Sequence, residues 1–361
     1  MSRALRIGGP VAVLVLLALV PKLSIDTNGV FSSPLDSPGT LQLLGLCLLF
    51  GGVALTYDLL FGFTGLLSFG HALYFACGVY MTDIAVTRWG FTLWQAILLT
   101  ALLGLVVPLV VGAVSLRVSG IAFAMVTLAF AQAGSILVSK NPDKLTGGEE
   151  GLALDFESVP DFFVGVVNTK NLYWLALGYL VLVCAVSWWA ISSSPGRVWQ
   201  AIRENEQRVD VLGLRPFSFK LVAFVLASFL ATLGGVVYLL LIGGASPEVT
   251  TANFTLTLLL MVVIGGTGTM WGAVLGGILY TYLDNRLLNV AGSERVQDLP
   301  GVLRTPLSEP LFVLGVIFIL IVYFLPGGLV GVGRRGRARG RTTIERALGR
   351  SRGEGGLGAT P

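Results

Sequence analysis

Ionisable side chains are scarce in this sequence. Asp, Glu, Lys and Arg together make up 12% of the 361 residues, and His71 is the one histidine. A soluble domain carries roughly twice that share of charge. Aliphatic and aromatic residues instead make up 54% of the chain, and the mean hydropathy is +0.82. The scarcity of charge excludes a soluble globular domain and predicts a protein that crosses a membrane several times.

Signatures of catalysis and of cofactor binding are also missing. Cys47, Cys77 and Cys184 lie in apolar stretches without Cys-x-x-Cys spacing, which argues against a disulfide framework and a zinc site. One histidine in an apolar stretch leaves no Ser/His/Asp arrangement for hydrolysis. The chain also lacks a GxxxxGKS/T phosphate loop. We therefore expect no catalytic, metal or cofactor site on this chain, and any ATP that drives it should bind to separate partner chains.

Long apolar runs predict an all-α polytopic membrane protein with about ten transmembrane helices. Arg3 and Arg6 precede the first run, and no small-residue cleavage site comes before Pro21, so we expect a retained helix and not a cleaved signal peptide. The predicted segments are approximately 7–20, 40–57, 59–86, 91–115, 119–138, 172–192, 219–241, 253–265, 268–287 and 309–325.

Loop charges predict the orientation of these segments. Residues 139–171 carry six acidic side chains and three lysines, residues 193–220 carry five basic side chains, and eight arginines lie from Arg334 onward. With ten crossings, the positive-inside rule places both termini in the cytoplasm and the acidic loop outside. Residues 332–361 are then an Arg/Gly-rich disordered cytoplasmic tail that fixes topology, with no nucleic-acid partner expected.

A charged island interrupts the apolar segments at 194–216. Ser194 is a candidate N-cap, Pro195 suits the first turn, and Gly213 followed by Pro216 predicts the end. We expect one short helix, about 194–213, lying on the membrane surface or against a protein docked there. Its predicted apolar stripe is formed by Val198, Ile202, Val209 and Leu212.

Two glycine-rich stretches resemble each other, GFTGLLSFG at 62–70 and GGTGTMWG at 265–272. They belong to the third and eighth predicted segments, which suggests two inverted five-helix halves. Glycine-interrupted segments at corresponding positions point to a midplane pathway. The alternative is that these glycines only allow helices to pack closely.

Asp58 and His71 are ionisable residues in or beside segment 59–86. A proton-coupled carrier working alone would use such a pair as a relay. The alternative interpretation places Asp58 at the interface and has His71 hydrogen-bonded to a neighbouring helix.

Four motifs taken together resemble a known family. They are SFGHALYF (68–75), LTGGEEGL (145–152), GRVWQAIRENEQRVDVLGL (196–214) and FLPGGLVG (324–331). In this order, within a stretch from about Leu43 to Gly331, they resemble the permease of branched-chain amino acid ABC importers. The resemblance implies a permease domain over 1–331 in a bacterial plasma (inner) membrane. It also implies a second permease subunit, two cytoplasmic ATPase subunits and an extracytoplasmic substrate-binding protein.

The resemblance also implies roles for two sets of residues. In such importers a cytoplasmic coupling helix sits in a groove of the ATPase, and here that contact falls on Gly196, Arg197, Ala201, Arg203, Glu204, Asn205, Glu206 and Gly213. We predict a substrate pathway lined by Thr64, Gly65, Ser68, His71, Thr127, Gly265 and Thr267. Glu149 and Glu150 depart from the family's usual residues, in a motif whose glycines predict a tight turn.

The sequence leaves three rival functions open. Permeases for urea or short-chain amides share these motifs, and selectivity in such systems resides largely in the delivering protein. A proton-coupled secondary carrier would need buried titratable groups. A passive channel would need neither ATP nor a gradient, and the charged helix argues against both of these autonomous alternatives.

Overall fold

The computed structural model describes residues 17–22, 34–165, 168–291, 309–324 and 327–331, and most of them are helical. The π-helix η2 (Leu59–Thr64) follows α2 directly, and five 3₁₀ turns cover Val20–Lys22, Pro142–Lys144, Phe156–Ser158, Asp161–Phe163 and Pro247–Thr250 (η7). The helices and strands are α2 (Pro38–Asp58), α3 (His71–Thr87), α4 (Leu93–Ser115), α5 (Ile121–Lys140), β1 (Leu152–Ala153), α6 (Thr169–Ser192), α7 (Ser194–Glu204), α8 (Glu206–Val211), α9 (Pro216–Ile242), β2 (Gly244–Ala245), α10 (Ala252–Gly265), α11 (Met270–Ala291) and α14 (Pro310–Phe324).

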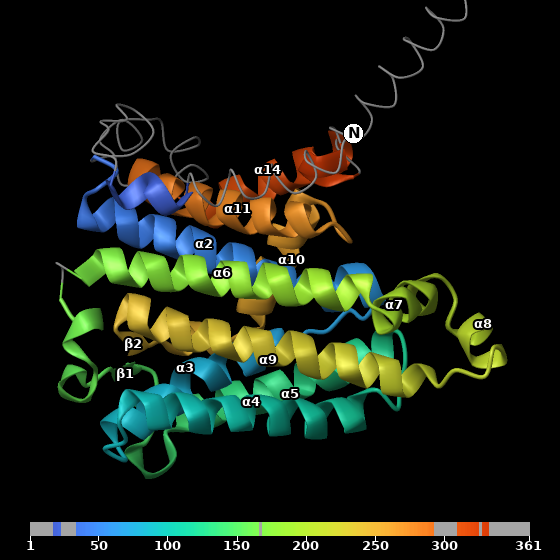
Figure 1. Cartoon of the computed structure of the whole chain (residues 1–361), viewed down its shortest axis with the longest axis horizontal. Helices are drawn as coiled ribbons and strands as arrows, with labels where there is room; N and C mark the ends of the chain where they lie inside the picture. Colours follow the sequence, from blue (N-terminus) through green and yellow to red (C-terminus); the bar gives the residue numbers. More distant parts are fainter. Residues whose placement is uncertain (1–16, 23–33, 166–167, 292–308, 325–326, 332–361) are drawn as a thin grey trace, which may run out of the picture.

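The long helices lie side by side as one bundle (Figure 1). Among the described residues, five helices are long and apolar enough to cross a membrane: α2 with η2, α4, α5, α6 and α9. The bent pair of α10 and α11, with 119° between its helices, makes a sixth if it is one span. The all-α polytopic class is confirmed. Of the first predicted segment, 7–20, only residues 17–20 are described. The predicted tail, 332–361, lies wholly outside the described residues.

Predicted segment 59–86 is not one helix, which corrects the sequence analysis. The chain continues α2 as the π-helix η2, then turns at Gly65, whose φ of +77° is left-handed. Residues 65–70 have no regular helix, and α3 begins at His71. Glycine adopts this left-handed conformation without the steric cost that a β-carbon brings. Glycines 65 and 70 therefore mark a break inside the bundle and not merely a packing surface.

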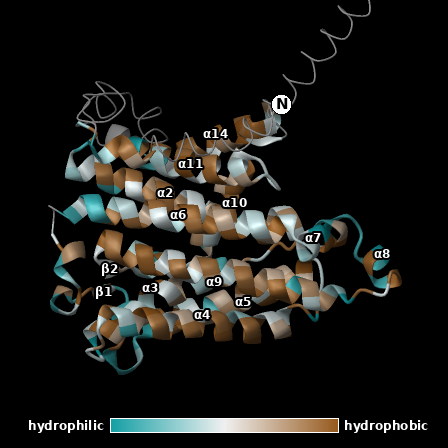
Figure 2. Cartoon of the chain, in the orientation of Figure 1, coloured by the Kyte–Doolittle hydropathy of each residue, from teal (hydrophilic) through white to brown (hydrophobic). Residues whose placement is uncertain are grey.

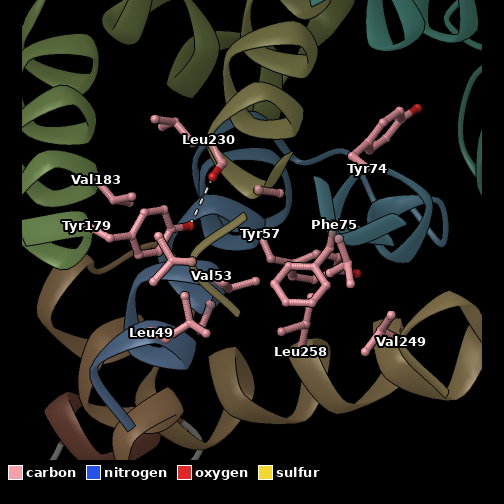
Figure 3. Close-up of a cluster of buried hydrophobic side chains, with 14 of the residues drawn as sticks. Leu49, Val53, Tyr57, Tyr74, Phe75, Tyr179, Val183, Leu230, Val249 and Leu258 are labelled. Carbon is pink, nitrogen blue, oxygen red and sulfur yellow. Dashed lines mark hydrogen bonds between the residues drawn. The ribbon is translucent and has the colours of Figure 1, made fainter. Parts of the chain in front are cut away.

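Helix α2 lies in the middle of the bundle, packed against α6, α9 and α11. Figure 3 shows Tyr179 of α6 among apolar side chains, with its hydroxyl donating to the carbonyl of Leu230 on α9 at 3.0 Å. Gly52 and Gly234 lie against the Tyr179 side chain, because a β-carbon on Gly52 would lie 2.7 Å from its ring and one on Gly234 would lie 2.6 Å from its hydroxyl oxygen. Small residues thus let three helices approach closely, as in other membrane bundles.

The two ends of the bundle differ. At one end β1 and β2 pair antiparallel, and the Asp155 N–H donates to the Thr87 hydroxyl at 3.1 Å. The tight turn predicted in 145–152 lies at this end, with Gly147, Gly148 and Gly151 all at positive φ. Helices α7 and α8 lie at the other end (Figure 1). The acidic loop and the charged island are therefore on opposite sides, as predicted, while the orientation in the membrane stays a prediction.

Hydrophobic residues lie along the whole length of the long helices (Figure 2), and many of their large apolar side chains are exposed. Many large ones are exposed on α4 and α5, among them Leu98, Leu102, Ile121 and Met125. A water-soluble protein rarely exposes so large a contiguous apolar surface. These faces fit contact with lipid or with another membrane subunit.

Gly78→Ala should destabilise the bundle. An ideal β-carbon at Gly78 lies 2.0 Å from the carbonyl oxygen of Thr232, so α3 and α9 would have to move apart. Overpacking of this kind costs about 1–3 kcal/mol. The matched control is Gly178→Ala on α6, where nothing lies within 4 Å of the new carbon. Thermal unfolding of both variants in detergent checks the expectation, and equal melting temperatures would contradict it.

Candidate functional site

The charged island folds as two helices, so the single predicted helix is wrong. Helix α7 ends at Glu204, and Asn205 adopts an extended conformation with φ −162° and ψ 105°. The Asn205 side chain then accepts the Arg208 N–H at 3.0 Å and caps α8. An asparagine side chain competes with the helix for backbone donors, which explains the break. The end at Gly213 is as predicted, with φ +81°.

The start of α7 also differs by one residue from the prediction. Ser193, and not Ser194, is the N-cap, and its hydroxyl accepts the Gly196 N–H at 3.4 Å. Gly196 packs against the end of α6, where a β-carbon would lie 2.3 Å from the Ala190 carbonyl. This close approach fixes α7 to the end of α6.

The inner side of the two helices anchors them to the bundle. Trp199, Ile202 and Val209 are buried, and the Trp199 indole donates to the Phe219 carbonyl at 2.8 Å. Glu206 and Lys220 form an ion pair of 2.5 Å across to α9. The predicted apolar stripe does not include Leu212. This side chain is 78% exposed, because α8 ends at Val211. The anchored part is therefore α7 and the start of α8.

The residues predicted to contact the ATPase divide between the two sides. Arg197, Ala201 and Glu204 are exposed on α7, and Gly213 has open space around it. Gly196, Asn205 and Glu206 serve internal contacts, as described above. Arg203 is exposed when the residue is taken as a whole, but its Nη1 donates to the Gly62 carbonyl in η2. Fewer residues are therefore available to contact a partner than the sequence analysis predicted.

A second group of predicted residues surrounds the break at 65–70. Thr127 of α5 accepts the Phe69 N–H at 3.1 Å, and Ser68 accepts the Gly70 N–H at 3.2 Å. Thr255 of α10 accepts the Ala72 N–H at 3.0 Å and donates to the Phe69 carbonyl at 3.3 Å. These hydroxyls replace the hydrogen bonds that a continuous helix would supply, and so make a break tolerable at membrane depth.

His71 belongs to this group. Its Nε2 lies 2.9 Å from the Thr56 hydroxyl on α2, and the edge-on ring of Tyr57 is 5.3 Å away between centroids. Its Nδ1 has no hydrogen-bond partner among the described residues. Asp58, by contrast, accepts the Gly268 N–H, so the two ionisable groups have different partners. The structure thus supplies no direct Asp58–His71 relay within the part of the chain it describes.

The other predicted pathway residues lie elsewhere. The Thr64 hydroxyl bonds to the Leu59 carbonyl of its own helix, and Gly65 lies against the Arg203 side chain. Gly265 packs on the Gly272 carbonyl, and Thr267 is exposed. The predicted set therefore separates into two groups. Ser68, His71 and Thr127 lie around the break at 65–70, whereas Gly65 lies beside α7 and Gly265 at the turn between α10 and α11.

Sequence reasoning missed Thr56 and Thr255 as members of the hydroxyl cluster. Both are fully buried in apolar helices. A threonine in such a helix usually bonds to its own backbone, as Thr56 also does to Val53 at 2.7 Å. The sequence carries no sign of which hydroxyl faces a broken segment. The hydroxyl cluster is defined as Thr56, Ser68, His71, Thr127 and Thr255.

A helical bundle with an internal break and a charged, anchored surface helix at one end is an arrangement expected of a transporter subunit. Comparison with known proteins agrees. Residues 39–322 match the family described as branched-chain amino acid transport system, permease component, and the chain belongs to this family. It is thus a permease component of a transport system.

Several similar proteins are also permeases of transport systems. The chain is 27% identical to the high-affinity branched-chain amino acid transport system permease protein LivM of Escherichia coli, covering 82% of this chain and 71% of the relative. It is 26% identical to a probable LivM of Methanocaldococcus jannaschii, over 65% and 67% of the two chains. It is 30% identical to the autoinducer 2 import permease LsrC of Yersinia pseudotuberculosis, over 50% and 48%. No solved structure matches the chain significantly.

Thr127→Val and Thr255→Val should each reduce transport. Each change removes the hydroxyl that satisfies a backbone group of 69–72, and an unsatisfied buried group costs about 1–3 kcal/mol. The control is Thr281→Val, because within the described part of the chain the Thr281 hydroxyl bonds only to the Gly277 carbonyl of its own helix. Substrate uptake normalised to protein level measures the effect. Uptake that is equal in all three variants would show that the hydroxyls at the break are dispensable.

Proposed function

We propose that the chain is one permease subunit of a binding-protein-dependent ABC importer, and that it carries branched-chain or other hydrophobic amino acids. ATP hydrolysis would occur on two cytoplasmic ATPase subunits. The observation that carries the proposal is the anchored α7–α8 unit, whose inner side is fixed to α6, α9 and η2 while Arg197, Ala201 and Glu204 stay exposed.

The anchoring matters because a docking element must transmit movement. A helix held only by flexible ends would absorb the motion of a partner. Here the N-cap at Ser193, the buried Trp199 and the Glu206–Lys220 ion pair hold the unit at three separate points. The free charges then set the register of docking more than its raw affinity. ATP-driven closure of the ATPase pair would move α7, and with it the helices that surround the break at 65–70.

The substrate class is supported by the relatives. LivM proteins are named for branched-chain amino acids, and the LsrC relative is named for autoinducer 2. The hydroxyls of the cluster are bonded to the backbone at 69–72, so the support for the substrate class comes from the relatives, and the amino acid would be released to this chain by a delivering protein. The proposed partners include that extracytoplasmic protein and a second permease subunit. Urea and short-chain amides are the competing substrates to test.

The tagged chain, extracted from its own membranes in mild detergent, should retain an ATPase subunit and a second permease in fixed proportion. Glu204→Arg should weaken ATPase retention about tenfold, since the exposed charge sets docking. The control is Lys170→Glu, an exposed charge reversal at the opposite end of α6, which should retain the ATPase fully. Mass spectrometry of the purified complexes measures both. A chain that is purified alone under conditions preserving a known importer would overturn the proposal.

His71→Ala separates the importer from a proton-coupled carrier. In the carrier, this substitution abolishes uptake and depletion of ATP has no direct effect. In the importer, uptake follows ATP and His71→Ala lowers it only through lost packing with Tyr57 and Thr56. Uptake into proteoliposomes, with and without internal ATP and with and without a pH gradient, distinguishes the two. Uptake that depends on the pH gradient and not on ATP would favour the carrier.

A further inference from the structure

Three glycine turns from distant parts of the chain meet beside α7. Gly62 of η2 faces Gly268 in the turn between α10 and α11, since a β-carbon on Gly62 would lie 2.4 Å from the Gly268 nitrogen. Gly328, in the last described segment, lies against Gly265 and Gly266 in the same way. We call this set the glycine junction. It joins the end of α2, the α10–α11 turn and the end of the described chain.

Asp58 is the charged residue at the centre of the glycine junction. It is fully buried, and its Oδ1 accepts the Gly268 N–H at 2.9 Å. The same oxygen would lie 1.9 Å from a β-carbon on Gly62, so glycine is required there. The Arg203 guanidinium brings a positive charge to the same junction, because its Nη1 donates to the Gly62 carbonyl. Asp58 thus links the end of α2 to the α10–α11 turn.

Arg203 brings α7 into the same junction. Its Nη1 donates to the Gly62 carbonyl, and a β-carbon on Gly268 would lie 2.7 Å from that nitrogen. The stem of Arg203 covers Gly65, which would meet its Cγ at 3.1 Å. One side chain of the surface helix therefore touches both glycine turns. The contact lies inside this chain and not on the free face of α7.

A buried charge has a cost that simple packing would not incur. Taking a carboxylate out of water is unfavourable unless opposite charge and hydrogen bonds compensate it, and a neutral side chain would fill the same space at less cost. Asp58 Oδ2 has no hydrogen-bond partner among the described residues. Among the described residues Arg203 forms no ion pair with Asp58 and donates instead to the Gly62 carbonyl. The Asp58 Oδ2 is therefore an unoccupied acceptor in the same junction as the Arg203 guanidinium.

We propose that Asp58 is a positioning residue that couples α7 to the α10–α11 turn, through its hydrogen bond to Gly268 and its attraction to Arg203. Movement of α7 then moves the end of α2 and the α10–α11 turn together. This inference rests on the proposed function, because it assigns the route by which the ATPase-driven motion enters the membrane helices.

The test is Asp58→Asn in the full complex, reconstituted with its ATPase partners in proteoliposomes. The amide keeps the shape and an acceptor oxygen for Gly268 but removes the charge that Arg203 attracts. We expect the amount transported per ATP hydrolysed to fall about tenfold or more, in line with the strength of charge-assisted hydrogen bonds, while the ATPase stays bound. The matched control is Asp83→Asn. Asp83 is a fully buried carboxylate near the C-terminal end of α3, and it accepts the Thr87 hydroxyl at 2.9 Å. Transport per ATP in this control should stay unchanged.

If the Asp58→Asn variant does not form the complex with the ATPase, variants of Arg203 test the same interaction. Arg203→Gln should lower transport per ATP similarly without loss of the ATPase, and Arg203→Lys should restore most of it because the charge returns. The double variant with Asp58→Asn should be no worse than either single change, since both remove one interaction.

The results separate two failures. A wild-type chain without a bound ATPase overturns the proposed function and this inference with it. A bound ATPase with normal transport per ATP in Asp58→Asn and Arg203→Gln overturns the inference alone. Loss of the ATPase in Arg203→Gln would also overturn it, by assigning Arg203 to the docking face.

Discussion

The backbone's need for hydrogen bonds inside a bilayer is the constraint on which the rest of this structure depends. Helices meet this need locally, which is why most of the described chain is helical. A break in a helix must find its bonds elsewhere. At 65–70 they come from Thr127 on α5 and Thr255 on α10, far away in the sequence. The break therefore holds together helices that would otherwise meet only through apolar contacts.

The same constraint explains why glycine gathers at the end of the bundle near α7. There the ends of α2 and α10 turn sharply, and their free N–H and C=O groups are exposed to neighbours that only glycine lets approach. The Gly268 N–H is bonded to the Asp58 carboxylate, and the Gly62 carbonyl to Arg203. A carboxylate and a guanidinium are strong partners for free backbone groups. Charge is rare in this chain, and some of it is used where backbone would otherwise be left unsatisfied.

The fold also explains how a surface helix can act on a membrane interior. Helix α7 is short, and isolated helices of that length are marginal in water. It persists because its inner face is buried and its ends are capped by Ser193 and by the turn at Asn205. The polar side is left free as a consequence of the anchoring. Rigidity and an available charged surface thus arise from the same few contacts.

The sequence by itself determined the class, the positions of most helices and the separation of the acidic loop from the charged island. Apolar runs and loop charges are local properties, so they can be read without the fold. It also marked the glycine stretches and the end of the island at Gly213. It did not show that Asn205 divides the island, because an asparagine in a helical pattern reveals its capping role only when its side chain finds a donor. Only the tertiary structure showed which residues make up the hydroxyl cluster and the glycine junction. Both depend on contacts across well over a hundred residues, such as Asp58 with Gly268 and Phe69 with Thr255. Periodicity and composition describe neighbours along the chain, whereas the packing of helices chooses which distant backbone groups meet.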